Sequence, residues 1–258
     1  MPSKLSLKPN SALFLLPHRD DEFGIYSQID FNVKSGNDVV CIYFTQNRQT
    51  DYDQKRNLES LSVLQKLGVK KENVIFPAYE LELFDLELEY RVAEITQWLK
   101  HFLKLNPQIT QIFVPAWEGG HPDHDIVHGI IVQLMAQQNR LDQIRQFSLY
   151  HNYKCPGSFF RVQAPLAANG PVEKIRISWS NRIRFLFYCL HYPTQTVTFI
   201  GLFPFIFIHH IFYGCQYLQK ISVERLKNRP MPGKLYYEVR QFSTYERVAK
   251  ALAKEFPR

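Results

Sequence analysis

The stretch that decides the fold is Ala12-Leu13-Phe14-Leu15-Leu16-Pro17-His18-Arg19-Asp20-Asp21-Glu22. Its first half, residues 12–16, is apolar without alternation, which predicts a strand buried on both faces of a parallel sheet. Its second half places a histidine and three acidic side chains directly after that strand. Proteins of the α/β class bind ligands beyond the carboxyl ends of such strands. We therefore expect an α/β fold with a functional site at this turn.

Strands and helices are predicted to alternate along the next part of the chain. Apolar or β-branched runs predict further strands at 38–45, 73–76 and 111–115. Helical patterns cover 22–34, 53–67, 88–105 and 123–138. This alternation predicts a Rossmann-like, doubly wound, mostly parallel sheet with helices on both faces. In the strand order 3-2-1-4, the first and fourth strands are neighbours at the switch in winding direction.

A second dense group of polar side chains follows the predicted fourth strand. It reads Gly119-Gly120-His121-Pro122-Asp123-His124-Asp125. Because the first and fourth strands are neighbours, the topology itself brings this group to the first one. Catalytic zinc takes three His or carboxylate ligands and leaves one position open for water. The expected ligands are His18, Asp21 and His124.

The remaining members of the two groups have expected roles in hydrolysis. Asp20 is the candidate general base, since a metal ion lowers the pKa of water and a nearby carboxylate can take its proton. His121, as an imidazolium, would stabilise an oxyanion or protonate a leaving amine. Asp123 would orient His121 or His124 by accepting a hydrogen bond. His124 and His128 stand four residues apart and could themselves form a pair of metal ligands. We favour His124 alone, because His128 lies a full helical turn from the strand end.

A structural interpretation of these residues competes with the metal site. Acidic side chains are electrostatically favoured at a helix start, and a single His–Asp pair often serves as a helix cap. Each group alone leaves the two interpretations balanced. Their joint placement at neighbouring strand ends favours the metal site.

These residues resemble the LmbE/PIG-L-like family of zinc-dependent N-acetylglucosaminyl deacetylases. Residues 17–22 are similar to the first family motif, usually (A/P)HPDDE, and residues 121–124 to the second, HPDH. Arg56 and Glu59, before Leu67-Gly68-Val69, resemble the R-x-x-E…LGV helix of the family. Residues 192–195 loosely resemble its H-x-S-Q segment. The resemblance is good over residues 10–135.

The resemblance implies a zinc-dependent N-deacetylase that hydrolyses the acetamide of an N-acetylglucosamine-type substrate with metal-activated water. It assigns Zn²⁺, with Fe²⁺ as the alternative, to His18, Asp21 and His124. Asp20 would be the base, and His121 would assist the tetrahedral intermediate. Two further residues would contact the substrate. Arg56 is the first, and Asp85 is a weaker candidate that would bind a sugar hydroxyl. The alternative functions are a zinc hydrolase of another amide and a catalytically silent carbohydrate- or membrane-binding homologue.

One position in the first motif departs from the family pattern. Arg19 stands where the family usually has proline. We expect its side chain to point to solvent, with contact to an anionic substrate as the alternative.

At 258 residues the chain is expected to form one large domain. Residues 1–150 would be the Rossmann-like catalytic core, and residues 151–258 an extension that completes the same domain and shapes the substrate cleft. Within the extension the expected elements are strands at 147–153, 174–180 and 234–239, a helix at 182–191, and a basic amphipathic helix near the end.

The most apolar part of the extension is the segment 196–218, which is interrupted by Pro204 and by His209-His210. It only approaches the roughly 20 apolar residues of a spanning helix. We therefore expect a buried core or irregular segment. An interfacial membrane anchor is the second interpretation, because Lys and Arg residues flank the segment. A transmembrane span is the third.

Charge and cysteine content bound the partners and the compartment. The net charge of +7 suits an acidic partner, but the basic residues are scattered and no nucleic-acid motif accompanies them. We expect a small-molecule or lipid-linked amino-sugar substrate and no nucleic acid. The four cysteines are expected to be free thiols, and residues 1–10 lack the apolar core of a signal peptide. A cytoplasmic protein is expected, at the inner membrane face if the segment 196–218 contacts lipid.

Overall fold

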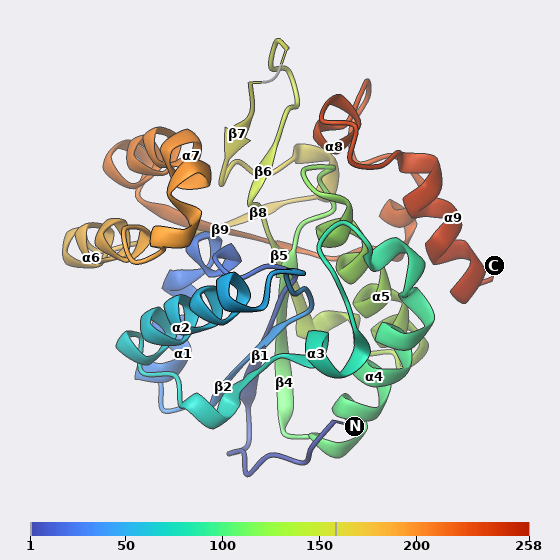
Figure 1. Ribbon diagram of the computed structural model, residues 1–258, viewed down its shortest axis with the longest axis horizontal. Coiled ribbons are helices and arrows are strands. Elements are labelled where there is room, and N and C mark those ends of the chain that lie inside the picture. The colour runs from blue at the N-terminus through green and yellow to red at the C-terminus, as the bar shows by residue number, and fades with distance from the viewer. Residues whose placement is uncertain (1, 158, 258) are drawn as a thin grey trace.

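The protein, described by a computed structural model over residues 2–157 and 159–257, is built on one seven-stranded sheet and a separate two-stranded sheet (Figure 1). The strands are β1 Ser11–Leu16, β2 Val39–Tyr43, β3 Val74–Ile75, β4 Ile109–Pro115, β5 Ile144–Phe147, β6 Tyr150–His151, β7 Arg161–Val162, β8 Val172–Arg176 and β9 Cys215–Lys220. The α-helices are α1 Tyr26–Lys34, α2 Thr50–Lys66, α3 Pro77–Leu81, α4 Val92–Leu105, α5 Pro122–Gln137, α6 Trp179–Cys189, α7 Thr196–Ile208, α8 Tyr236–Val239 and α9 Tyr245–Glu255.

The large sheet has the strand order β3-β2-β1-β4-β5-β9-β8. The five strands from β3 to β5 are parallel, and β9 and β8 continue the sheet as antiparallel neighbours. The predicted order 3-2-1-4 is confirmed, and so is the α/β fold class. Strands from the last hundred residues of the chain thus extend the sheet that the first part begins.

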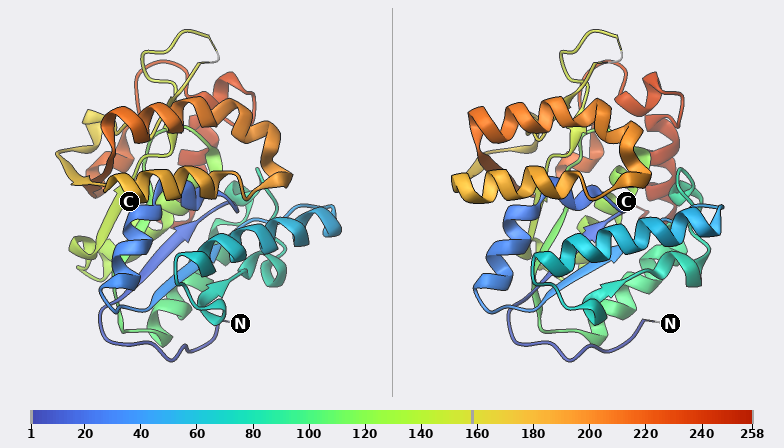
Figure 2. Two further views of the ribbon diagram at one scale, coloured as in Figure 1. Left: turned by 90° about the vertical axis from the view of Figure 1, so that its left-hand side faces the viewer. Right: turned by 60° about the vertical axis from the view of Figure 1, so that its left-hand side comes forward.

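Strand β1 is buried on both faces, as its unbroken apolar sequence predicts. Leu13 and Leu15 belong to one core cluster, together with side chains of α4, α5 and α9. Phe14 and Leu16 belong to the other, together with side chains of α1, α2, α6 and α7. Because successive side chains of a strand point to opposite faces, the two clusters take alternate residues of the stretch 12–16, all of which are apolar. Figure 2 shows helices on both sides of the sheet.

Several element boundaries differ from the sequence-based expectation. The helix expected from residue 22 is preceded by a short 3₁₀ turn, Asp21–Gly24, and α1 begins only at Tyr26. The strand expected at 147–153 is divided between β5 and β6, and the strand expected at 174–180 ends at Arg176. Ser178 then caps α6 by accepting a hydrogen bond from the Asn181 backbone N–H.

The strand predicted at 234–239 is wrong, because this segment forms the short helix α8. Its aromatic and branched residues satisfy burial rather than strand pairing: Leu235 and Tyr237 are fully buried. The backbone N–H of Tyr236 donates to the Gly119 carbonyl at 2.9 Å, which ties α8 to the second polar group.

The prediction of a buried core segment at 196–218 is wrong for much of its helical part, 196–213, whereas the residues at its end, 214–218, are mostly buried. The segment forms α7, continues as a π-helical turn, His209–Tyr213, and returns to the sheet as β9. The helical stretch Pro193–Tyr213 is, by length and composition, long and apolar enough to cross a membrane. Only 28% of its most apolar 18 residues are buried. Along α7, only Phe199, Leu202 and Ile206 are buried. The other apolar side chains of α7 are partly or largely exposed.

Candidate metal centre

The two polar groups meet at the carboxyl ends of β1 and β4. His18 and Asp21 follow β1, and His124 lies in the first turn of α5, which follows β4. The two strands are hydrogen-bonded neighbours. The topology therefore places side chains 106 positions apart in the chain within hydrogen-bond distance of each other.

The expected ligand atoms form a compact buried triangle. His18 Nδ1 lies 3.1 Å from His124 Nε2, and His124 Nε2 lies 3.1 Å from Asp21 Oδ1. Asp21 Oδ2 lies 3.4 Å from His18 Nδ1. Zinc–ligand bonds of about 2.0–2.2 Å at tetrahedral angles require ligand separations of roughly 3.3–3.5 Å. The donor set and its spacing fit a divalent metal ion.

The charges at this centre support the same arrangement. Although burial alone would raise the pKa of Asp21, the facing His124 and His18 hold that pKa well below its usual range. Burial lowers the pKa of His18, but Asp85 and Asp21 outweigh it and raise the pKa well above its ordinary value. Asp21 is therefore ionised, which is the form of a carboxylate that binds a metal ion.

Asp20 lies beside the triangle in a left-handed backbone conformation, with φ of 101°. Its side chain is buried, and burial raises the pKa of Asp20 to about 8 against the opposing effect of Arg56. The nearest guanidinium nitrogen of Arg56 is 3.7 Å from Asp20 Oδ1. A carboxylate with a raised pKa matches the requirement for a general base near neutral pH.

Glu22 fixes the backbone that carries Asp20. Its Oε2 accepts the Asp20 backbone N–H at 3.0 Å, and its Oε1 accepts the Tyr192 hydroxyl at 2.7 Å. Glu22 is fully buried. The side chains whose ligand atoms lie close enough to share a metal ion form two sets that both contain His18 and omit Glu22: His18, Asp21 and His124, and His18, Asp85, His121 and Asp123. It supports the turn rather than the metal.

His121 is the N-cap residue of α5. Its Nδ1 accepts the Asp123 backbone N–H at 3.2 Å, which leaves Nε2 as the protonated nitrogen of the neutral ring. Burial and the neighbouring His18 lower the pKa of His121 well below its ordinary value. The neutral ring is therefore favoured over the expected imidazolium, and its Nε2–H is available as a hydrogen-bond donor. The ring centroid lies 4.4 Å from that of His18.

The two remaining acidic residues at the centre both contact His18. Asp123 Oδ2 accepts a hydrogen bond from His18 Nε2 at 3.2 Å, so Asp123 orients His18 rather than the expected His121 or His124. Asp85 Oδ1 lies 3.0 Å from the same nitrogen. The side chain of Asp85 is 44% exposed, which places it at the open side of the centre.

Arg56 and Arg19 both extend from the rim of the centre, but only Arg56 faces it. Arg56, on α2, donates to the Arg19 carbonyl at 2.8 Å and lies beside Asp20. The expectation that Arg19 points to solvent is wrong, and so is its alternative, since the side chain is only 1% exposed. It donates to Asp53 at 2.8 Å and to Asn57 at 2.6 Å, both on α2. These partners stand four residues apart, so they share one face of the helix.

The part of the chain that carries both polar groups matches a known protein family. Residues 13–135 match the family model described as PIG-L: GlcNAc-PI de-N-acetylase. The matched residues include His18, Asp20, Asp21 and His124. No curated protein matches the chain.

Solved structures share the fold at low sequence identity. A teicoplanin deacetylase, solved in its zinc-inhibited form, is 13% identical with a TM-score of 0.62, and the match covers 83% of this chain and 98% of that one. An N,N'-diacetylchitobiose deacetylase from Pyrococcus horikoshii is 18% identical with a TM-score of 0.57, and the match covers 83% of each chain. These similarities show that the fold shared with these two structures extends beyond residues 13–135.

The loosely matched segment 192–195 lies against helix α2. The Thr194 backbone N–H donates to Glu59 at 2.9 Å, and Gln195 Nε2 donates to the Tyr52 hydroxyl at 2.9 Å. Together with the Tyr192–Glu22 hydrogen bond, these contacts join the segment before α7 to the rim of the centre.

Sequence reasoning missed the aromatic side chains that contact the histidines. The Tyr150 ring lies 5.7 Å from the His124 ring, and the Phe242 ring lies 5.9 Å from that of His121. Both line a pocket of about 360 Å³ with these further residues: Phe160, Val197, Thr198, Gly201, Leu202, Tyr236 and Arg240. In the sequence, Tyr150 and Phe242 cannot be distinguished from aromatic residues of the core. The fold is therefore needed to identify them.

Proposed function

We propose that this protein is a metal-dependent N-deacetylase that hydrolyses the acetamide of an amino sugar. The observation that carries the proposal is the buried triangle of His18, Asp21 and His124 with Asp20 beside it. The three atoms suit a metal ion, and the adjacent carboxylate suits a base. The family match agrees with hydrolysis of this kind of amide.

The proposed metal is Zn²⁺, with Fe²⁺ as the alternative, held by His18, Asp21 and His124. When bound, such an ion lowers the pKa of water and polarises a carbonyl oxygen. Two nitrogen ligands and one carboxylate are a common set for catalytic zinc. The hydrogen bond from His18 Nε2 to Asp123 fixes the orientation of that ring, as supporting carboxylates do at metal sites.

The residues around the triangle have proposed roles in the reaction. Asp20 takes a proton from the attacking water molecule, whose oxygen forms the new bond to the acetyl carbon. The Nε2–H of His121 donates to the oxygen that gains negative charge. The C–N bond then breaks, and the proton held by Asp20 passes to the leaving amine, which gives acetate and a free amino sugar.

Two further residues are proposed to hold the sugar. Arg56 is fixed beside Asp20 by its hydrogen bond to the Arg19 carbonyl. Asp85 lies on the open side of the centre, where a carboxylate accepts hydrogen bonds from sugar hydroxyls.

The aglycone is proposed to be a lipid. The pocket of about 360 Å³ beside the two histidines has apolar walls from Leu202 and Val197 of α7 and from Phe160, and Arg240 supplies a cation. An amino sugar linked to an apolar chain through an anionic group matches this lining. A cytoplasmic location is proposed as well, supported by the four free cysteines.

The proposed function is tested by metal analysis with an acetate-release assay. Protein loaded with Zn²⁺ or Fe²⁺ should release acetate from N-acetylglucosaminyl compounds, faster from a long-chain alkyl glycoside than from the free sugar. A chelator should abolish release and added metal should restore it. If the protein hydrolyses other acetamides but no N-acetylglucosaminyl compound, the proposed amino-sugar substrate is wrong and the enzyme acts on another amide. Protein that binds no divalent metal stoichiometrically would overturn the enzyme assignment.

A further inference from the structure

Helices α6 and α7 expose an unusual share of the apolar side chains of the molecule. Among the described residues, ten of the sixteen exposed large hydrophobic side chains lie between residues 179 and 213. We call these ten the α6–α7 surface: Trp179, Ile183, Phe187, Leu190, Val197, Ile200, Phe207, Ile208, Phe212 and Tyr213. Exposed apolar patches of this kind mark interaction sites.

The exposed residues follow the helical period on each helix. On α6 they recur every three or four residues from Trp179. On α7 and its π-helical turn they are Val197 and Ile200, followed by the adjacent pairs Phe207–Ile208 and Phe212–Tyr213. Each helix therefore buries one apolar stripe in the core and presents a second one outside. Figure 2 shows α6 and α7 side by side at the end of the molecule to which the β6–β7 hairpin also rises.

The chain around this surface carries more basic than acidic residues, although Arg184 is paired with Asp30 of α1 at 2.6 Å. From Lys174 to Val223 the chain contains no Asp or Glu, and it contains five basic residues: Lys174, Arg176, Arg182, Arg184 and Lys220. The Arg182 guanidinium lies over the Trp179 ring, 4.4 Å from its centroid. An aromatic side chain beside a cation is typical of a segment that lies at a membrane interface.

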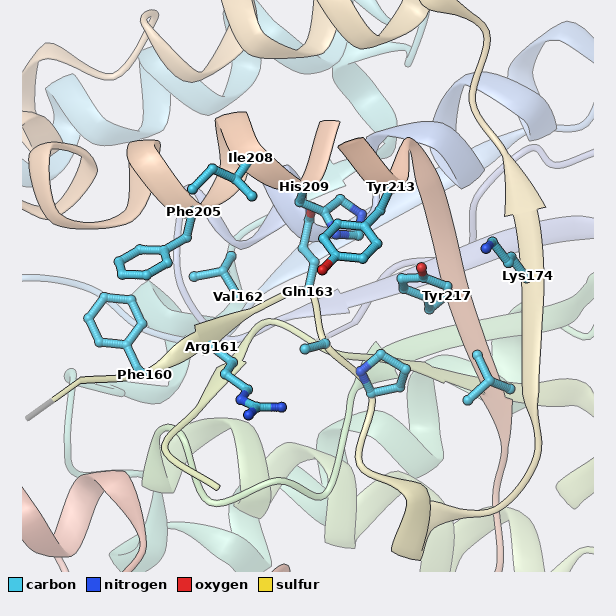
Figure 3. Close-up of a pocket in the computed structure, with 13 residues that line it drawn as sticks. Phe160, Arg161, Val162, Gln163, Lys174, Phe205, Ile208, His209, Tyr213 and Tyr217 are labelled. Atoms are coloured by element: carbon cyan, nitrogen blue, oxygen red, sulfur yellow. The ribbon is translucent and has the colours of Figure 1, made fainter. Parts of the chain in front are cut away.

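A pocket of about 710 Å³ lies between α7 and the chain around β7 (Figure 3). Phe205 and Ile208 of α7 form its apolar side, and Arg161 and Lys174 are its cations. The residues that line it include no Asp or Glu. An apolar wall beside two cations fits an amphiphile with an anionic head group.

We propose that the α6–α7 surface and this pocket dock the protein on an anionic phospholipid bilayer. The helices would lie on the membrane, because both ends of the Pro193–Tyr213 stretch are fastened to the same body. Tyr192 donates to Glu22 before α7, and β9 pairs with β5 after it. A chain fixed in this way presents its apolar face to a bilayer without threading through it.

A second copy of the chain fits this surface less well than lipid does. An isologous dimer would bring two faces with an excess of basic residues together, and like charges across an interface are unfavourable. Anionic lipid complements both the apolar stripes and the charge.

Docking here would also place the metal centre close to lipid. The pocket beside His121 and His124 is lined by Leu202, on the buried side of α7, and by Val197, which also belongs to the α6–α7 surface. That consequence rests on the proposed function, whereas bilayer binding itself does not. A lipid-linked sugar could then enter the centre from the membrane that the protein is bound to.

The test is co-sedimentation with vesicles of phosphatidylcholine alone and of phosphatidylcholine with phosphatidylglycerol. Wild type should sediment with the anionic vesicles and be released by salt. Ile200→Asp/Phe207→Asp should weaken binding at least about tenfold, since it removes apolar contacts and adds negative charge. Arg161→Glu/Lys174→Glu should remove the preference for anionic vesicles. The matched control, Leu58→Asp/Tyr90→Asp, changes two other exposed apolar residues outside the α6–α7 surface and should bind as wild type does.

The possible results separate docking from catalysis. Circular dichroism and acetate release from a water-soluble substrate report whether the Ile200→Asp/Phe207→Asp variant is folded and active, so loss of sedimentation alone supports the proposal. Wild type that stays in the supernatant with anionic vesicles at low salt would overturn it, whatever its activity. Equal binding by the α6–α7 and control variants would overturn it too. A wild-type dimer that the α6–α7 substitutions dissociate, without vesicle binding, would assign the surface to self-association.

Discussion

At the scale of single residues, Asp20 combines a strained backbone with a chemical role. Its φ of 101° is held by the hydrogen bond from its N–H to Glu22. Asn tolerates left-handed conformations and matches Asp in shape, so Asp20→Asn should fold and bind metal normally. Without a proton acceptor it should lose about 10²–10⁴-fold in acetate release. Metal content and turnover measured on one preparation check this, and an active Asp20→Asn would show that the base lies elsewhere.

Arg19 illustrates a residue whose role is structural although it stands in the first motif. It forms a buried ion pair with Asp53 at 2.8 Å, with both side chains 1% exposed. Asp53→Ala would leave a buried guanidinium without its countercharge, so it should lower the free energy of unfolding by about 3–5 kcal/mol. Urea denaturation measures this. Glu224→Gln, at the exposed Lys227–Glu224 pair, is the control and should change stability little. A comparable loss in both variants would contradict the buried-pair argument.

At the scale of elements, α5 carries a buried histidine that belongs to the core and not to the metal centre. His128 Nδ1 donates to the Pro115 carbonyl at 2.8 Å, and its ring lies 5.9 Å from that of Trp117. Burial lowers the pKa of His128 to about 4. The neutral ring therefore fastens the start of α5 to the end of β4.

This histidine predicts a pH dependence of stability. In the unfolded chain, His has a pKa near 6.5, so between pH 6.5 and 4 the unfolded state binds more protons than the folded state. Stability should fall as the pH decreases through this window, with about 3 kcal/mol from His128. In His128→Gln, which keeps a donor for Pro115, this part of the decline should be missing. Parallel pH profiles of the unfolding free energy for the two proteins would exclude His128 as its source.

Elements with strong local patterns were predictable from sequence, and those defined by long-range packing were not. The apolar runs of β1, β2 and β4 are buried on both faces, so composition alone identifies them. For α8, aromatic residues suggested a strand, but contacts with the distant Gly119 and burial of Tyr237 select a helix. For α7, the apolar composition suggested a helix buried in the core. A helix that exposes one apolar face has the same composition, so the sequence does not distinguish the two.

At the scale of the whole molecule, the clusters at the candidate site were predictable because topology decides which strand ends meet. The partners within the site were not. The sequence did not indicate that Asp123 would bond to His18, that Arg19 would turn inward to Asp53, or that Tyr150 and Phe242 would contact the histidines. Such pairings depend on side-chain directions of elements far apart in the chain.

The metal should also stabilise the whole molecule, because its proposed ligands come from two parts of the fold. His18 and Asp21 follow β1 and His124 belongs to α5, so a bound ion joins these elements only in the folded state. At a hundred times its dissociation constant, a ligand of this kind adds about 2.7 kcal/mol, which corresponds to a rise in Tm of roughly 5–10 °C. Thermal unfolding with Zn²⁺ or with a chelator measures the shift. His124→Ala should show no rise, whereas His101→Ala, on the exposed side of α4, should keep it. A full shift in His124→Ala would place the ion at another site.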